Sequence, residues 1–154
     1  MPPDLWRFAE EFYQRPGVEA ACLQMQAQGM DVCLLLCALW LDSRGVPCNA
    51  ERLQTLRNLA QPWQAQVVAP LRQLRQSWRA AAQDDKALKQ LREQVKRLEL
   101  EAERELVQRL AALSGDWPTS ASGQQVDWLM RLTGEVAAPD ALQSLRIAAA
   151  RTWA

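Results

Sequence analysis

The sequence predicts an all-α protein: a single-domain helical bundle of about seven to eight helices, with a long antiparallel helical hairpin. Apolar residues recur three and four positions apart in almost every segment, which is the period of an amphipathic helix. The chain lacks sustained period-two alternation and Asn-Gly turns, so no strand is expected. Its 154 residues, 49% of them hydrophobic and 23% charged, suit one globular domain and argue against a disordered or fibrous chain.

The first part of the bundle core is expected in residues 1–60. Asp4 is a suitable cap for a first amphipathic helix, and Pro16-Gly17 ends that helix. A second helix follows and closes at Gly29. The apolar stripe of the first helix consists of Leu5, Phe8, Ala9 and Phe12.

The most apolar run of the chain is 32–41, ten residues without a charge. Asp31 can cap it, and a helix that is apolar all round is typical of the centre of a bundle. A membrane span needs about 20 residues, so this run is too short to be one and no span is expected. Asn49 then caps a fourth helix over 50–60.

The predicted hairpin has arms 62–82 and 84–113. Pro70 lies inside the first arm and should kink it or split it in two. Asp84 and Asp85 are cap candidates for the second arm, and the connection is short, so the arms should be antiparallel neighbours. At roughly 1.5 Å per residue the second arm would be on the order of 45 Å long, so it must project from the body or bend around it.

An apolar seam runs along the second arm. Its members alternate three and four positions apart over about two heptads, the spacing of a coiled coil. They are Leu88, Leu91, Val95, Leu98 and Ala102. The next heptad position is Glu105, and the seam resumes at Leu106, as after a four-residue stutter.

After the hairpin we expect a loop and two short helices. The domain therefore divides into core helices 1–60, a hairpin 62–113, a loop 114–123 rich in Ser, Gly, Thr and Pro, and two helices within 124–154. The inward positions are Val126, Leu129, Met130 and Leu132 in the first of these helices, and Leu142, Leu145, Ala149 and Trp153 in the second.

Several classes of function are disfavoured by the composition. The chain has no histidine, which excludes an imidazole-based triad and any metal site that uses histidine. Eighteen basic and eighteen acidic residues cancel, so nucleic acid is an unlikely partner. Nucleotide-binding, hydrolase and metalloprotease motifs are missing from the sequence. We therefore expect no catalytic residues and no cofactor. Glutamates 99, 101, 103 and 105 alternate along the second arm, where a charged, solvent-exposed surface is the expected interpretation.

The four cysteines raise one possible metal site, a zinc site. Because the N-terminus shows no export signal, we expect a cytoplasmic protein with reduced thiols. Four thiolates could bind zinc, but the spacing contains no paired CxxC, so buried packing thiols are the favoured role. The cysteines are Cys22, Cys33, Cys37 and Cys48.

An uneven charge distribution singles out the first arm. Residues 44–82 hold six arginines and one acidic residue, whereas residues 1–43 hold two basic and six acidic residues. Arg72, Arg75 and Arg79 fall on one helix face and could clamp phosphates or the carboxylates of a partner. The alternatives are a solvated face, or pairing with the acidic first helices.

Aromatic side chains suggest two further contact points. Seven tryptophans are many for this length, and most fall on the apolar stripes, where they should pack in the core. Trp6 and Tyr13 lie off the stripe of the first helix and could form a second, partner-facing surface. Trp117 lies in the loop and could be exposed, and exposed tryptophan is a frequent interface anchor.

About half of the chain, residues 4–80, resembles an uncharacterised family of short proteobacterial conserved hypothetical proteins, a domain of unknown function. Its stretches here are Leu5-Trp6-x-Phe8, Phe12-Tyr13-x-x-Pro16-Gly17-Val18-Glu19-x-Ala21-Cys22-Leu23, Asp31-Val32-x-Leu34-Leu35-Leu36, Leu39-Trp40-Leu41 and Pro62-Trp63-x-x-x-Val67-Val68-x-Pro70-Leu71-x-x-Leu74-Arg75. The resemblance implies a cytoplasmic protein and assigns no activity, ligand or functional residue.

Two functions from different classes remain open. The first is a non-enzymatic cytoplasmic interaction or adaptor module that uses the hairpin and its arginine-lined face, with another protein or a second copy as partner. The alternative is a helical bundle that binds a small apolar or anionic ligand in its interior, with Arg72 or Arg75 at the pocket mouth.

Overall fold

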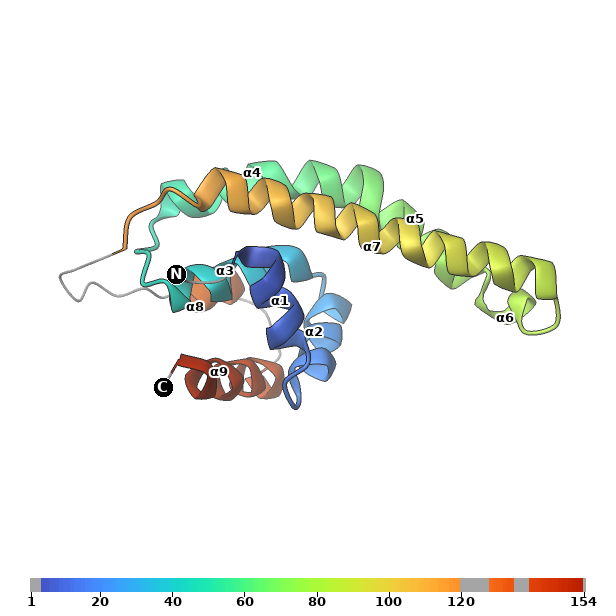
Figure 1. Cartoon of the computed structure of the whole chain (residues 1–154), viewed down its shortest axis with the longest axis horizontal. Helices are drawn as coiled ribbons and strands as arrows, with labels where there is room; N and C mark the ends of the chain where they lie inside the picture. The colour runs from blue at the N-terminus through green and yellow to red at the C-terminus, as the bar shows by residue number, and fades with distance from the viewer. Residues whose placement is uncertain (1–3, 120–127, 135–138, 154) are drawn as a thin grey trace.

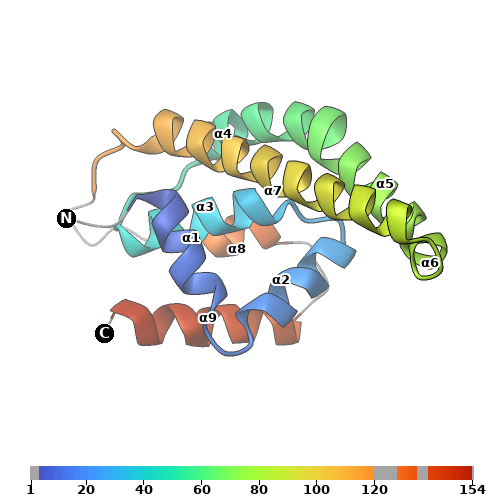
Figure 2. The same ribbon diagram turned by 45° about the vertical axis from the view of Figure 1, so that its right-hand side comes forward.

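The computed structural model describes residues 4–119, 128–134 and 139–153. Every regular element in these ranges is a helix, which confirms the all-α prediction. Figure 1 shows a long hairpin across the top of the molecule and a body of shorter helices beneath one half of it. The other half projects beyond the body, and Figure 2 shows the same arrangement from a second direction.

The body consists of α1 (Leu5–Tyr13), α2 (Val18–Ala27), α3 (Val32–Ser43), α8 (Trp128–Thr133) and α9 (Pro139–Trp153). The hairpin has a first arm made of α4 (Ala50–Trp63), the π-helical segment η1 (Gln64–Val68), α5 (Ala69–Ser77) and α6 (Arg79–Ala82). Its second arm is α7 (Lys86–Ser114).

Four helices begin at predicted cap residues that make their hydrogen bonds, and of the two candidates for the second arm it is Asp85, not Asp84, that caps α7. A side-chain oxygen of the cap accepts from the backbone N–H three residues later, at 2.8 to 3.2 Å. Such a bond satisfies one of the backbone donors that a helix start leaves free. The caps are Asp4, Asp31, Asn49 and Asp85.

Helix α3 lies at the centre of the body, as its apolar sequence predicts. All of its residues from Cys33 to Leu41 are buried. Helices from both the body and the hairpin pack around it, among them α1, α7 and α8. Full burial of one such leucine stabilises the fold by roughly 1.5–3 kcal/mol, so the burial of α3 contributes substantially to the stability of the core.

The first arm starts earlier than expected. We predicted a break between residues 60 and 62, but α4 continues through Pro62 into η1. In η1 the backbone N–H of Ala69 donates to the carbonyl of Gln64, five residues back. The wider turn lies directly before Pro70, whose ring would clash with a carbonyl in a regular α-helix. The regular helix is therefore interrupted next to Pro70, as predicted, and the arm still remains continuous.

Helix α8 docks on α3 through polar and apolar contacts. The carboxylate of Asp42 accepts the backbone N–H groups of Trp128 and Leu129, at 2.8 and 3.1 Å. The indole of Trp128 is fully buried and donates to the carbonyl of Val46.

The predicted inward stripe of this helix was wrong for Met130, which is exposed. Val126, another member of that stripe, and the side chain of Trp153 lie outside what the structure describes.

Candidate functional site

The arginines of the first arm form an ion-pair network inside the hairpin. Arg75 Nε lies 2.6 Å from Glu99 Oε1, and Arg72 Nε lies 3.3 Å from Glu99 Oε2. Arg72 also pairs with Glu103, at 3.7 Å. Two of the three predicted arginines therefore bind carboxylates of their own chain. The acidic residues concerned belong to α7, whereas the sequence had pointed to the first helices.

The third arginine is separate from this network. Arg79 opens α6 and is exposed, beyond the end of α5 at Ser77. The arginine-lined face therefore does not act as a single clamp in this structure. The partner role of Arg79 stays a prediction.

Two carboxyl groups near the network have raised pKa values. Burial, with a smaller contribution from the neighbouring Glu99, raises the pKa of Glu103 to about 7, and the charge of Arg72 partly offsets these effects. Burial also raises the pKa of Asp31 to about 6, although the N–H of Leu34 and the amide of Gln64 partly offset this. The prediction of an exposed acidic surface was wrong for Glu99, which is buried.

We expect the Glu103→Gln variant to be less dependent on pH than the parent protein. The folded-state pKa of Glu103, about 7, lies above the ordinary value of 4.5, so the folded state holds a proton that the unfolded state releases. The stabilisation that protonated Glu103 gives the folded state is complete below about pH 4.5 and is lost as the pH rises through about 7. Glutamine mimics the protonated form, so it should raise the free energy of unfolding at pH 8 by roughly 1–3 kcal/mol.

Urea unfolding between pH 4.5 and 8 measures this effect. The difference between the two curves isolates Glu103 from the other carboxylates. Glu101→Gln changes an exposed glutamate of the same helix and should leave the pH profile close to that of the parent. Equal pH profiles for Glu103→Gln and the parent would contradict the prediction.

The predicted seam on α7 was only partly correct. Val95 and Ala102 are buried, and Leu88 is partly buried. Leu91 and Leu98 are instead 49% and 51% exposed. Two of the five seam residues are therefore on an exposed side of α7 rather than at the contact with the first arm.

Charged side chains occupy the inward positions next to these leucines. Arg92 Nε donates to the backbone carbonyl of Arg75 at 2.9 Å, and Glu99 receives both guanidinium groups of the network. A buried charge is costly unless it is paired and hydrogen-bonded. Pairing with Arg72 and Arg75 therefore turns Glu99 inward, and this rotation of α7 turns Leu98 outward.

The exposed leucines of the two arms share one side of the hairpin. On each arm an exposed leucine directly precedes an inward charged residue, such as Leu74 before Arg75 and Leu98 before Glu99. Moving back by one residue along an α-helix rotates the side-chain direction by about 100° around the helix axis. Because the arms are antiparallel and face each other, this rotation carries the leucines of both arms to the same side.

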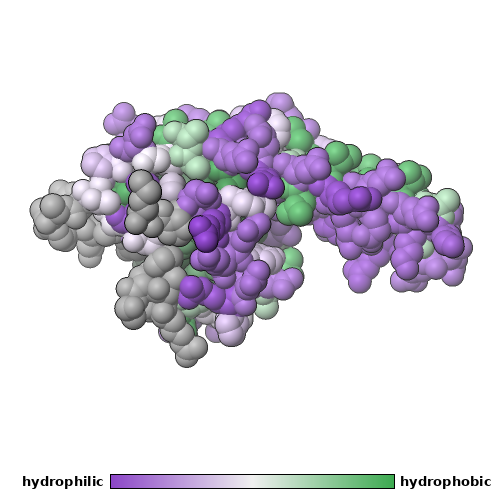
Figure 3. Space-filling model, in the orientation of Figure 1, coloured by the Kyte–Doolittle hydropathy of each residue, from purple (hydrophilic) through white to green (hydrophobic). Residues whose placement is uncertain are grey.

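We call this side the outer face. Figure 3 shows hydrophobic residues along the upper edge of the projecting hairpin, away from the body, with a hydrophilic flank below them. The side chains are exposed or only partly buried. The outer face consists of Leu71, Leu74, Trp78, Leu91 and Leu98.

The predicted aromatic contact points are largely used within the body. Trp6 is half-buried, and the guanidinium carbon of Arg104 lies 5.0 Å from its ring centroid. Tyr13 packs against the core, and burial raises its pKa to about 12. Trp117 stacks on Trp128 with ring centroids 5.7 Å apart. These contacts do not support the expected partner-facing surface at Trp6 and Tyr13, or an exposed Trp117.

All four cysteines are free and buried. Burial raises the pKa of Cys22 and Cys37 to about 12, and raises that of Cys33 as well. The Cys33 thiol donates to the backbone carbonyl of Glu103 at 3.7 Å. Among the described residues there is no group of three or more histidine, cysteine, aspartate or glutamate side chains that could hold a metal ion.

Comparison with known proteins identifies the family. A family model described as a protein of unknown function, DUF2390, matches residues 4–110. The chain belongs to the DUF2390 family. The match covers α1 to most of α7, so both arms of the hairpin belong to the DUF2390 domain, which extends beyond the expected 4–80. This confirms an uncharacterised family, while a proteobacterial origin stays a prediction.

The other comparisons add no further relative. Among curated proteins and solved structures, nothing matches this DUF2390 chain. No helix in the described part of the chain combines the length and the apolar character that crossing a membrane requires. We therefore infer the function from the contacts, burial and charges within the hairpin and the body.

Proposed function

We propose that this DUF2390 protein is a non-enzymatic interaction module that binds an amphipathic helix of another protein on the outer face of its hairpin. The observation that carries the proposal is the alignment of exposed leucines from both arms on one side. Two helices that pack against each other bury the side chains at their contact. They leave exposed a stripe of side chains that points about 90° away from that contact. A third helix laid along the groove between them would bury these leucines, which is a common mode of helix recognition.

The charge of the hairpin specifies the partner further. Residues 71–98 contain eight basic and three acidic residues. Arg72 and Arg75 are paired internally, and most of the remaining basic side chains are exposed. A partner helix with acidic flanks would complement this charge, whereas a second copy of the hairpin would bring like charges together. We therefore infer an acidic amphipathic helix.

The chemistry of the hairpin supports binding more than catalysis. Glu99 and the two arginines satisfy one another, so they do not form a nucleophile with an activating base. Four free cysteines are typical of a reducing compartment, which supports the cytoplasm as the place of action.

We expect the double variant Leu91→Asp/Leu98→Asp to lose the partner while it keeps the fold. Both side chains are exposed, so the substitutions should change stability little. A photo-crosslinker at the exposed position Gln94, in the full-length chain in cells, should capture a protein through an acidic amphipathic helix. A synthetic peptide of that helix should bind the double variant at least about tenfold more weakly than the parent.

Leu100→Asp is the matched control. Leu100 is 55% exposed and lies nine positions after Leu91, on the opposite side of α7. This variant should bind the peptide like the parent. Equal binding by the double variant, or a crosslink that joins only two copies of this chain, would overturn the proposal.

A further inference from the structure

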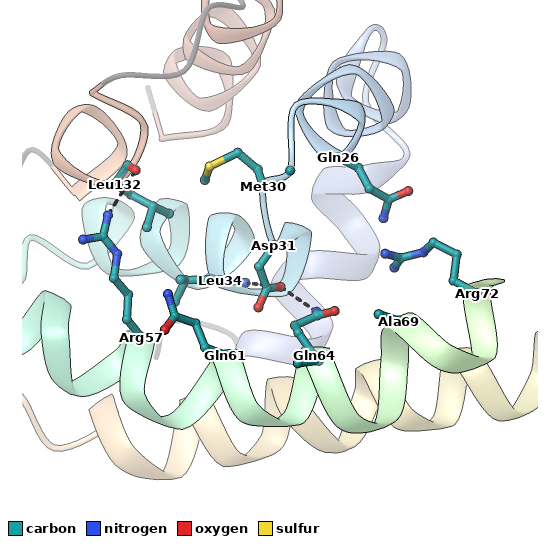
Figure 4. A pocket seen from close by; sticks show the side chains of 12 residues that line it. Gln26, Met30, Asp31, Leu34, Arg57, Gln61, Gln64, Ala69, Arg72 and Leu132 are labelled. Carbon is teal, nitrogen blue, oxygen red and sulfur yellow. Dashed lines mark hydrogen bonds between the residues drawn. The ribbon is translucent and has the colours of Figure 1, made fainter.

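A pocket of about 620 Å³ lies where the first arm of the hairpin crosses the body. In Figure 4 its floor is one face of the continuous first arm, with Arg57 near one end and Arg72 near the other. Met30 and Asp31, from the turn between α2 and α3, lie opposite this floor, together with Leu132 of α8. Small-molecule sites commonly have about this size, roughly 300–1,000 Å³, and form where several elements meet.

Asp31 is the unusual group in this pocket. Its Oδ1 accepts the backbone N–H of Leu34 at 3.2 Å and the amide of Gln64 at 2.8 Å. Its Oδ2 is buried and accepts no hydrogen bond of normal geometry within the described structure, although the backbone N–H of Cys33 also acts on this carboxyl group and lowers its pKa. Capping α3 needs only one of the two oxygens, and a buried acceptor without a donor is destabilising. The hydrogen bonds from Leu34 and Gln64 therefore account for the burial of Oδ1, whereas no such bond compensates the burial of Oδ2.

The exposed side chain of Gln61 lies between Arg57 and Gln64 in the pocket view, beside the carboxyl group of Asp31 (Figure 4). A ligand that displaces this exposed side chain would reach Oδ2 from the pocket. An incoming donor would then supply the hydrogen bond that Oδ2 lacks.

The charges around the pocket restrict what can enter it. A purely anionic molecule would meet the carboxylate of Asp31, and a purely cationic one would meet Arg57 and Arg72. The Arg72 guanidinium points from α5 into the pocket, and its charge acts on Asp31. The ammonium group of a zwitterionic ligand would supply the donor that Asp31 Oδ2 lacks, and its carboxylate would be a further partner for Arg72, which also pairs with Glu99 and Glu103. Apolar surface from Met30 and Leu34 is available for an uncharged part of the ligand.

We propose that this pocket binds a small zwitterion of the amino-acid or dipeptide type, with its ammonium group on Asp31 and its carboxylate on Arg72. The carboxamides of Gln61 and Gln64 offer further donors and acceptors for the polar atoms of such a ligand. The site lies on the body side of the hairpin, away from the outer face. The proposal is therefore independent of partner binding there.

The test uses the full chain, the twenty L-amino acids and the twenty glycyl dipeptides, in thermal-shift and calorimetric titrations. At least one probe should raise the melting temperature. Asp31→Asn should weaken its binding at least about tenfold, because asparagine still caps α3 but carries no negative charge. Asp4→Asn changes the cap of α1 in the same way and should bind the probe like the parent.

Modified probes make the result independent of the variants. The N-acetylated form of the same probe lacks the ammonium group, its C-terminal amide lacks the carboxylate, and both should bind at least about tenfold more weakly. Three outcomes would each overturn the proposal. They are no binding by any probe, equal binding by Asp31→Asn and the parent, and equal binding by the acetylated and free probes.

Discussion

Replacement of Glu99 by alanine is expected to lower the free energy of unfolding by roughly 3 kcal/mol. The carboxylate is buried between the arms and neutralises two guanidinium groups, with Nε to oxygen distances of 2.6 Å for Arg75 and 3.3 Å for Arg72. Without it both arginines remain in the hairpin with no charge partner at that position. The side chains of Arg72 and Arg75 are 19% and 22% exposed, so water relieves part of the cost, and the effect falls at the lower end of the range for broken buried pairs.

Urea denaturation with two further variants tests this explanation. Glu105→Ala removes an exposed ion pair with Arg109 on the same helix and should cost less than about 1 kcal/mol. The quadruple variant Arg72→Met/Arg75→Met/Glu99→Leu/Glu103→Gln replaces the whole network, including the Glu103 partner of Arg72, with uncharged side chains. It should recover most of the stability, because no charge is left unpaired. A loss for Glu99→Ala no larger than that for Glu105→Ala would contradict a central role for the network.

The same network explains why the sequence predicts the hairpin well and its faces poorly. Leu88, Arg92, Val95 and Glu99 follow the same spacing along α7 as the predicted leucine seam. Judged from the sequence of α7 alone, the leucines are the expected buried residues, because burying the charged side chains of Arg92 and Glu99 is costly. The compensating arginines lie on the other arm, so periodicity along α7 could not reveal them. One signal was available: Arg72 and Glu99 lie almost equally far along the chain from the turn at Asp85.

Features that depend on neighbouring residues were predicted correctly. The four helix caps depend on a backbone N–H only three residues away, and the central position of α3 follows from its own composition. The pocket could not be predicted in this way. Asp31, Arg57, Arg72 and Leu132 come from four separate parts of the chain, and only the packing of the hairpin on the body brings them together.

Trp128→Ala should destabilise the protein more than Glu99→Ala does, with a loss of roughly 3–5 kcal/mol in the free energy of unfolding. The side chain is completely buried, its indole N–H donates to the carbonyl of Val46 at 2.6 Å, and its ring stacks on Trp117. Truncation would leave a large cavity and an acceptor without its donor. Trp128→Phe keeps a ring and loses the N–H, so an intermediate loss is expected.

Met130→Ala provides the control, because Met130 lies on the same short helix and is 45% exposed. Its loss should stay below about 1 kcal/mol in the same urea experiment. If Trp128→Ala cost no more than this control, α8 would not be part of the cooperative core. The expected large difference has a structural meaning, because Trp128 lies outside the matched residues 4–110. Helix α3 is apolar all round, and α8 packs against it, so the DUF2390 domain of this chain depends on residues beyond the family match to bury its central helix.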